Sequence, residues 1–385
     1  MTATPSGSPS DYGCKLCGAT DRPLTGTMLN RRCSNSVACA ERLRAKSRPV
    51  LAAAPKPTAP NRYGVRNANN TPAEALIALL QQQAHLETIT GPLEFSDDLK
   101  LPLIAAQGRY VCFGKSGSGK SNVSAVMIEN CLIEHIPVCA LDSLGNLWGL
   151  RRAGVIDGLA IPIIGGAHGD RPLAVDEGTK LARIFADGHS ILIDSSELTR
   201  EDQQTFASEF FKESMRVLRR PAHIVVEEGE TICPAFTRSK SHFASQGAVS
   251  LFARQIRNYG VGWTFSTQRL PLLHPDVVDA SNAFLAMQTT GDIAQRAIGR
   301  EAKTRVGSTV ATAILNELGQ LAVGYAWLIP DPSLLETEVG APVRFKFRQR
   351  WTFDSTAVPR FGAVCAAPPK AVPVDMKPFS TSEKK

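Results

Sequence analysis

One run of residues carries the clearest chemistry in the sequence: Gly114-Lys115-Ser116-Gly117-Ser118-Gly119-Lys120-Ser121. It fits the pattern G-x-x-x-x-G-K-[ST] without a mismatch, after an apolar stretch and before a helical one. The glycines let backbone N–H groups turn inward around phosphate oxygens, and a helix start adds its positive end. Lys120 supplies a cation for the β- and γ-phosphates, and Ser121 offers a hydroxyl to Mg²⁺. The run therefore predicts a site for a nucleoside triphosphate, ATP with Mg²⁺.

Two carboxylates follow a later apolar stretch, at Glu227 and Glu228. Ligands bind at the carboxyl ends of strands in parallel sheets, so this position suits a magnesium site. We expect Glu227 to contact the Mg²⁺ shell and Glu228 to polarise the attacking water. The usual order is Asp then Glu, and Glu227 is one methylene longer than Asp. Asp142 ends another apolar stretch, where it either supports the site or caps the turn that it begins.

Gln268 and Arg257 are further candidates. Gln268 follows the apolar stretch 262–267, where it can lie beside the γ-phosphate or simply end a strand. Arg254 and Arg257 are three apart on one face of a predicted helix. An arginine near the end of such a helix can act in a neighbouring subunit's site as an arginine finger, or it can be a surface charge.

Short apolar runs alternate with helical patterns from Gly108 onward, which predicts an α/β domain with a mostly parallel sheet. The strands are expected at Tyr110–Phe113, Pro137–Leu141, Ile191–Asp194, His223–Glu227, Gly262–Thr267, Ala283–Gln288 and Leu321–Ile329. Helices are expected at Ser121–Glu134, Glu201–Leu218 and Ala248–Tyr259, and from a Thr71 cap to about Thr88.

Composition divides the chain into five segments: disordered residues 1–12, a Cys/Arg-rich unit at 13–45, a Pro/Ala-rich linker at 46–70, an ATPase domain at 71–353 and a flexible tail at 354–385. No run approaches the roughly 18 apolar residues that cross a bilayer, and no signal peptide is evident, so we expect a cytoplasmic protein without a membrane partner. The net charge of +7 suits a polyanionic partner but does not identify one.

Four of the nine cysteines, Cys14, Cys17, Cys33 and Cys39, crowd into the first forty residues. Their spacing predicts one Zn²⁺ site with four thiolates, although five residues between the second pair are more than usual. The unit is too short for an apolar core, so the metal would fold it. Its arginines and lysines favour contact either with DNA or with a protein partner. The cysteines of the later apolar stretches are expected to be small buried hydrophobes.

Further stretches stand in order along residues 101–329: Cys112–Asn122, Ala140–Leu150, Ile164–Leu173, Ile193–Ser196, Glu227-Glu228, Arg257–Val261, Thr267–Pro271, Thr290–Asp292 and Leu318–Gly324. Together they resemble the HerA/FtsK branch of RecA-like motor ATPases, specifically HerA-like helicase-domain proteins. Two positions depart from the family pattern, because Asn146 replaces a Glu and Glu227 replaces an Asp. The β-barrel that often precedes the motor domain has no obvious counterpart.

The resemblance implies a RecA-like ATPase that assembles as a hexameric ring, hydrolyses ATP between subunits and moves duplex DNA through its pore. It assigns Lys120, Ser121 and the adjoining Asn122 to the nucleotide and metal. Glu228 would act on water, Gln268 as sensor and Arg257 as a trans finger.

Two other functions remain open on the sequence. One is a nucleotide-dependent switch that binds DNA or a partner, hydrolyses slowly and does not translocate. The other is an ATPase of a conjugation or packaging complex, which would need a membrane or portal partner. The sequence does not say whether a nuclease partner exists.

The ring interpretation predicts the mass of the particle. With an ATP analogue and Mg²⁺, the purified chain should have the mass of a hexamer in light scattering or mass photometry. A particle that stays monomeric at all protein concentrations would remove the trans role of Arg257.

Overall fold

The computed structural model describes residues 71–83, 91–97, 99–237, 239–331, 341–356 and 367–380, and two short strands, β1 (Leu24–Thr25) and β2 (Arg32–Cys33). The chain separates into two compact units, Met1–Pro60 and Asn61–Lys385. In the first unit, β1 pairs antiparallel with β2. The predicted zinc ligands, the disordered segment 1–12 and the linker 46–70 lie outside the described residues, apart from the backbone of Cys33. The zinc site therefore stays a prediction.

A nine-stranded sheet forms the centre of the second unit, in the order β13-β12-β11-β5-β10-β9-β6-β8-β7. Neighbours from β11 to β7 pair in parallel, and β12 and β13 add an antiparallel edge. The strands are β5 (Arg109–Phe113), β6 (Val138–Asp142), β7 (Ile163–Ile164), β8 (Ile191–Asp194), β9 (Ala222–Val226), β10 (Val261–Thr267), β11 (Ala283–Met287), β12 (Tyr325–Pro330) and β13 (Val343–Lys346). A separate small hairpin joins β3 (Leu93–Glu94) to β4 (Lys100–Leu101). The α/β class with a mostly parallel sheet, predicted from alternating patterns, is confirmed.

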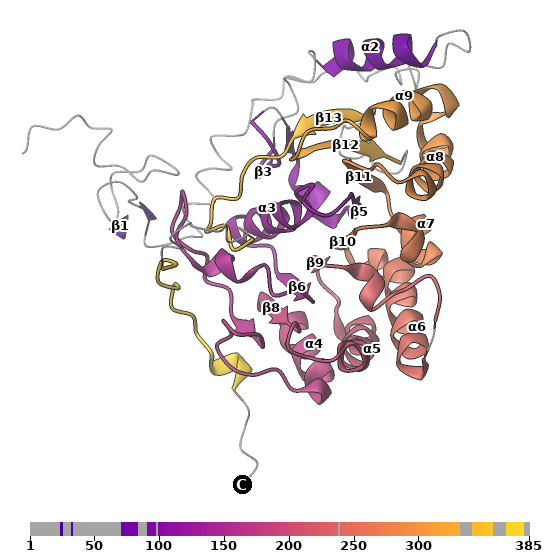
Figure 1. Cartoon of the computed structure of the whole chain (residues 1–385). Helices are drawn as coiled ribbons and strands as arrows, with labels where there is room; N and C mark the ends of the chain where they lie inside the picture. Colours follow the sequence, from indigo (N-terminus) through magenta and orange to yellow (C-terminus); the bar gives the residue numbers. More distant parts are fainter. Residues whose placement is uncertain are drawn as a thin grey trace, which may run out of the picture. The chain divides into compact units, whose positions relative to one another are not determined.

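Helices cover both faces of this sheet. The helices are α2 (Pro72–Gln83), α3 (Lys120–Ile133), α4 (Gly178–Ala186), α5 (Arg200–Val217), α6 (Lys240–Gln255), α7 (Pro275–Ala280), α8 (Asp292–Val306) and α9 (Ser308–Leu318). In Figure 1, α3 lies on one side of the strands and α4 to α9 on the other. Side chains of β5 alternate between the two cores, because Val111 and Phe113 pack with α5 and α6 while Tyr110 and Cys112 pack with α3. None of the helices in the described part of the chain is long and apolar enough to span a membrane.

The predicted elements agree with the structure to within a residue or two where the pattern is strongly apolar. The Thr71 cap is confirmed, since the Thr71 hydroxyl accepts from the Glu74 N–H at 3.4 Å and the Glu74 carboxylate accepts from the Thr71 N–H at 2.7 Å. The largest difference is α6, which begins at Lys240 rather than Ala248. Its first two turns have little apolar periodicity, but the Ser239 hydroxyl caps them by accepting from the His242 N–H. The predicted strand Leu321–Ile329 also begins later, at Tyr325.

Part of the expected flexible tail packs on the second unit. Phe379 is 1% exposed and belongs to the core beneath α4. The Val372 N–H donates to the Arg151 carbonyl at 2.8 Å, and Arg152 pairs with Ala371 in an isolated bridge. A Pro- and Lys-rich composition had suggested no structure here, but a single buried aromatic ring and a few backbone bonds are enough to order residues 367–380. Residues 367–380 therefore make packing contacts that the composition of the predicted tail did not suggest.

His223 is a buried polar residue at the centre of the fold. Its Nδ1 donates to the Ala106 carbonyl at 2.7 Å, and its Nε2 accepts from the Thr264 hydroxyl at 2.9 Å. Because a carbonyl can only accept, Nδ1 carries a proton, and in the neutral ring Nε2 is then the acceptor. Burial lowers the pKa of His223 to about 4, against the opposing effect of the Ala106 bond. The side chain thereby ties β9 to β10 and to the 3₁₀ turn Leu103–Gln107.

The depressed pKa of His223 predicts a loss of stability in mild acid. The unfolded chain takes up a proton on this ring below pH ~6.5, whereas the folded chain does not until about pH 4. The stabilisation is therefore complete above pH 6.5 and is lost as the pH falls toward 4. Between pH 7.5 and pH 5.0, wild type should lose about 2 kcal/mol more unfolding free energy than His223→Gln, measured by urea denaturation. Equal losses in the two proteins would contradict the neutral ring.

Candidate functional site

The predicted phosphate loop joins the end of β5 to the start of α3, as its pattern requires. Gly117 and Gly119 have φ of +76° and +108°, the left-handed region that side chains rarely adopt. At Gly114, a Cβ would lie 2.7 Å from the Ser118 hydroxyl and 2.8 Å from Met287 Cβ. The N–H groups of Asn122 and Val123 donate to the Gly119 carbonyl, whereas those of Lys120 and Ser121 come before the first helical hydrogen bond and can face an anion. The loop thus has the tight curvature that backbone binding of phosphate needs.

Lys120 and Ser121 lie at the first turn of α3. The Lys120 ammonium donates to the Gly114 carbonyl at 2.9 Å and to the Lys115 carbonyl at 3.2 Å, so it sits over the loop itself. Lys115 and Ser116 are exposed and Ser118 is buried beside Met287. The side-chain amide of Asn122 faces elsewhere: it donates to the Arg348 carbonyl and accepts from the Arg350 N–H. Asn122 therefore anchors a later segment of the chain, a role that the sequence did not suggest.

Glu227 reaches the phosphate loop from the end of β9. Its carboxylate is 3% exposed and accepts from the Ser121 hydroxyl at 2.9 Å. The hydroxyl of Ser124, one turn further along α3, bonds to its other oxygen. The structure brings together Ser121 and Glu227, the two residues predicted to meet Mg²⁺. Ser124 was missed, although its spacing of three from Ser121 on a helix was an available signal.

Glu228 and Gln268 also meet, at the ends of β9 and β10. The Gln268 side chain donates to the Glu228 carboxylate at 2.8 Å. Glu228 has φ +51°, an uncommon conformation for a residue other than glycine. Backbone strain of this kind concentrates at functional sites, and here the strained residue carries the carboxylate that bonds to Gln268. The proposed base and the proposed sensor are therefore hydrogen-bonded neighbours.

A third carboxylate in this group, Glu230, was not predicted. Burial and, to a smaller extent, the charge of Glu228 together raise its pKa to about 7. One Glu230 oxygen accepts from the Gln268 backbone N–H at 3.4 Å. It stands two residues after Glu228, but its partner Gln268 follows β10 and is 38 residues away, so sequence alone gave no reason to choose it.

Asp142 is a turn cap as well as a neighbour of the site. Its carboxylate accepts from the N–H groups of Leu144, Gly145 and Leu147 at 2.8–3.0 Å. Burial raises its pKa to about 7, with further contributions from the charges of Glu227 and Asp194. Of the two interpretations left open by the sequence, the capping contacts are the ones present.

Arg257 lies at the amino ends of the parallel strands, whereas the phosphate loop lies at their carboxyl ends. It precedes β10, whose first residue Val261 pairs with Ala222, the first residue of β9. Its charge acts on Arg109, the first residue of β5, whereas the phosphate loop follows the last. Five strand residues span about 16 Å, so Arg257 does not reach the loop of its own chain. Only a second chain could bring it to such a site.

The residues present fit a magnesium ion bound together with a nucleotide. Ser121 supplies one hydroxyl and Glu227 one carboxylate, and Mg²⁺ in such sites takes its other ligands from phosphates and water. No group of three or more His, Cys, Asp or Glu side chains suited to a metal occurs among the residues whose placement is described.

Comparison with known proteins identifies the fold. Neither a scan against protein-family models nor a search of curated proteins finds a match. Among solved structures, the bacterial conjugative coupling protein TrwBdeltaN70 in its unbound form is similar with a TM-score of 0.50, covering 75% of this chain and 94% of that chain at 7% identity. The chain has the RecA-like P-loop ATPase fold.

Two further structures show weaker similarity. A genome packaging NTPase from Sulfolobus turreted icosahedral virus 2, in complex with AMP, matches with a TM-score of 0.41 and 11% identity over 63% of this chain and 98% of that chain. The cytoplasmic domain of the type VII secretion ATPase EccC from Thermomonospora curvata matches with a TM-score of 0.37 and 16% identity over 71% and 32%. At identities this low, neither match shows the function of this chain.

The curvature of the loop predicts that Gly119→Ala weakens ATP binding at least tenfold. A Cβ at φ +108° is strained and would lie 3.2 Å from Met287 Cε, so the loop must change shape. Strain of about 1.4 kcal/mol already corresponds to a factor of ten. Gly247→Ala is the matched control, since a Cβ there meets nothing within 4 Å. Titration with a fluorescent ATP analogue measures the affinity of each variant. Equal affinities in the two variants would contradict phosphate binding by the loop backbone.

Proposed function

We propose that this protein is an ATPase that uses ATP hydrolysis to move along DNA. The observation that carries the proposal is a convergence at the carboxyl edge of the sheet. There, Ser121 of the phosphate loop donates a hydrogen bond to Glu227. The next residue, Glu228, accepts a hydrogen bond from Gln268. This is the set of groups that phosphoryl transfer to water needs: a phosphate cradle, a metal-binding hydroxyl, and a carboxylate with a polar neighbour.

Each side chain has one task in the proposed reaction. The loop N–H groups and the Lys120 ammonium bind the β- and γ-phosphates, and Lys120 exchanges its bonds to loop carbonyls for bonds to phosphate. Bound Mg²⁺ would neutralise charge on the phosphates, held by Ser121 with Glu227 behind it. Glu228 accepts a proton from the attacking water and Gln268 holds the Glu228 carboxylate in position. Loss of the γ-phosphate would change the position of Gln268 through its hydrogen bond to Glu228.

A ring of subunits, six in the proposed assembly, fits the separation of Arg257 from the phosphate loop. The site lies at one edge of the sheet and Arg257 at the other, so a neighbouring subunit can supply the missing arginine. The sequence resemblance to HerA-like motors adds duplex DNA as the substrate. The coupling protein that shares the fold acts in conjugation, so a role in a conjugation or packaging complex is a variant of the same proposal.

A nucleotide-dependent switch without translocation is the second candidate. The Ser121 hydroxyl is already bonded to Glu227, and Ser124 holds the other oxygen of this long side chain. A carboxylate held in this way slows hydrolysis if it must rearrange to admit the metal. In either function, the predicted zinc unit at 13–45 would recruit the protein to DNA or to a partner.

Lys120→Ala should abolish ATP turnover that wild type shows with Mg²⁺ and duplex DNA, because the phosphates lose their only mobile cation from the loop helix. Phosphate release measured per subunit, with and without DNA, gives the result. Lys212→Ala removes the same group from an exposed position on α5 and should leave turnover unchanged.

The outcome of this experiment also separates the two candidates. Turnover that rises several-fold with duplex DNA supports the motor. Slow turnover whose rate is the same with and without DNA, together with tight ATP binding, supports the switch. Wild type that shows no turnover at any DNA concentration excludes the motor.

A further inference from the structure

The helix that carries the phosphate loop is buried on every side. Residues from Val123 to Cys131 are all buried, which means that α3 is covered on its outer face as well as against the sheet. Part of this cover is the segment from Phe347 to Thr356, which we call the strap, and the hairpin of β3 and β4 adds to it through Asn130 and Glu94. Its backbone is fixed to Asn122 and, two turns later, to Glu129, which accepts from the Thr352 N–H at 2.8 Å.

Two arginines of the strap point into this interface. Arg348 donates to the Glu129 carboxylate at 2.6 Å and to the Glu94 carbonyl at 2.9 Å, and its guanidinium lies 3.5 Å from the ring centre of Trp351. Arg350 turns the other way, toward the phosphate loop. The side chain of Arg350 is 2% exposed. The strap thus has one cation at the middle of α3 and one at its first turn.

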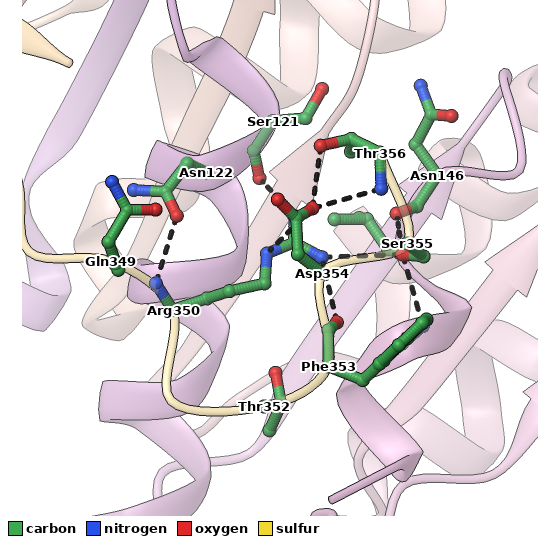
Figure 2. Close-up of polar contacts among 12 residues, drawn as sticks. Ser121, Asn122, Asn146, Gln349, Arg350, Thr352, Phe353, Asp354, Ser355 and Thr356 are labelled. Carbon is green, nitrogen blue, oxygen red and sulfur yellow. Dashed lines mark hydrogen bonds and ion pairs between the residues drawn. The ribbon is translucent and has the colours of Figure 1, made fainter. Parts of the chain in front are cut away.

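Arg350 contacts Ser121 directly. One guanidinium nitrogen donates to the Ser121 carbonyl at 3.1 Å, and a second lies 3.3 Å from the Ser355 hydroxyl and 3.5 Å from the Phe353 carbonyl. Figure 2 shows Arg350 between Ser121 and residues 353–355. Its Nε makes no hydrogen bond within the described part of the chain and lies 3.9 Å from the Asp354 carboxylate.

Acidic groups of the site partly offset the cost of burying the charge of Arg350. The carboxylates of Asp354, Glu129, Glu227 and Asp142 all attract it. Of these, Glu227 is itself bonded to the Ser121 hydroxyl. Ser121 is therefore held from two sides, its side chain by a carboxylate and its backbone by a guanidinium, and the two holding groups attract each other.

We propose that Arg350 is a positioning residue of the nucleotide site, which fixes the first turn of α3 so that the Ser121 hydroxyl stays at the metal position beside Glu227. The inference rests on the proposed function, since it concerns magnesium bound with the nucleotide. Arginine suits this task because its planar fork bonds several oxygens in a fixed geometry, whereas lysine offers a single point charge. Within the described residues, the guanidinium of Arg350 bonds to Ser121 on α3 and otherwise to Phe353 and Ser355 of the strap, so we expect it to act through Ser121.

The test separates binding of nucleotide from its enhancement by Mg²⁺. A fluorescent, non-hydrolysable ATP analogue is titrated onto the full chain in EDTA and in millimolar Mg²⁺, and the ratio of the two affinities is the magnesium gain. Arg350→Gln should lower the magnesium gain about tenfold, the smaller end of the losses seen when an outer contact to a metal site is removed. Its affinity in EDTA should stay within about twofold of wild type, because the cradle is intact.

Arg348→Gln is the matched control. It removes a buried arginine from the same strap, but its partner Glu129 lies two turns from Ser121. It should lower the melting temperature at least as much as Arg350→Gln and leave the magnesium gain unchanged. A purely structural strap predicts instead that the gain follows stability in both variants.

Arg350→Lys carries the test if Arg350→Gln does not fold. Lysine keeps the positive charge but lacks the planar guanidinium that bonds several oxygens at once. Its magnesium gain should therefore be higher than that of Arg350→Gln and within about threefold of wild type. An unchanged gain in both variants at position 350, or an equal loss in Arg348→Gln, would overturn the positioning role. Wild type that binds no nucleotide would instead remove the proposed function, and this inference with it.

Discussion

The bond between the Ser121 hydroxyl and the Glu227 carboxylate is the interaction on which the site depends. The two residues follow different strands, β5 and β9, which are separated by β10. In a parallel sheet the carboxyl ends of all strands lie at one edge, so a helix that starts after β5 can touch a carboxylate that ends β9. The register of β10 with both neighbours sets that distance. The packing that fixes the strand register therefore also fixes the distance between Ser121 and Glu227 at the carboxyl ends of the strands.

Buried charge explains why α3 is enclosed by a segment from the end of the chain. Removing one partner of a buried ion pair costs about 3–5 kcal/mol, because the other charge is left without compensation. Glu129 is fully buried and has Arg348 as its partner, and the acidic groups near Ser121 have Arg350. The strap is held to α3 by this requirement as much as by apolar contact. It also links the phosphate loop to the antiparallel edge strand β13, from which the strap continues.

Much of the fold could be read from the sequence, because its signals are local. An apolar run of five residues specifies a buried strand wherever it lies, and the phosphate loop contains its own glycines, lysine and hydroxyl. The ends of β5, β8 and β10 fell within one residue of the prediction for this reason. The start of α6 and the packing of Phe379 did not, since each depends on one contact, a serine cap or a pocket beneath α4, that leaves no periodic pattern.

The sequence by itself determined the phosphate loop, the strongly apolar strands β5, β6, β8, β9, β10 and β11, and the carboxylates that follow β9, because each is a property of adjacent residues. The strands β7 and β13 and the helices α4, α7, α8 and α9 were not predicted. Only the tertiary structure decided which of these groups meet. Ser124 and Glu227 are 103 residues apart and Arg350 and Ser121 are 229 apart, so no spacing rule connects them. Likewise, the parallel register assigns Gln268 to Glu228 and sends Arg257 to the far edge. Contacts of this kind arise from the packing of whole elements, which a pattern of neighbouring residues does not encode.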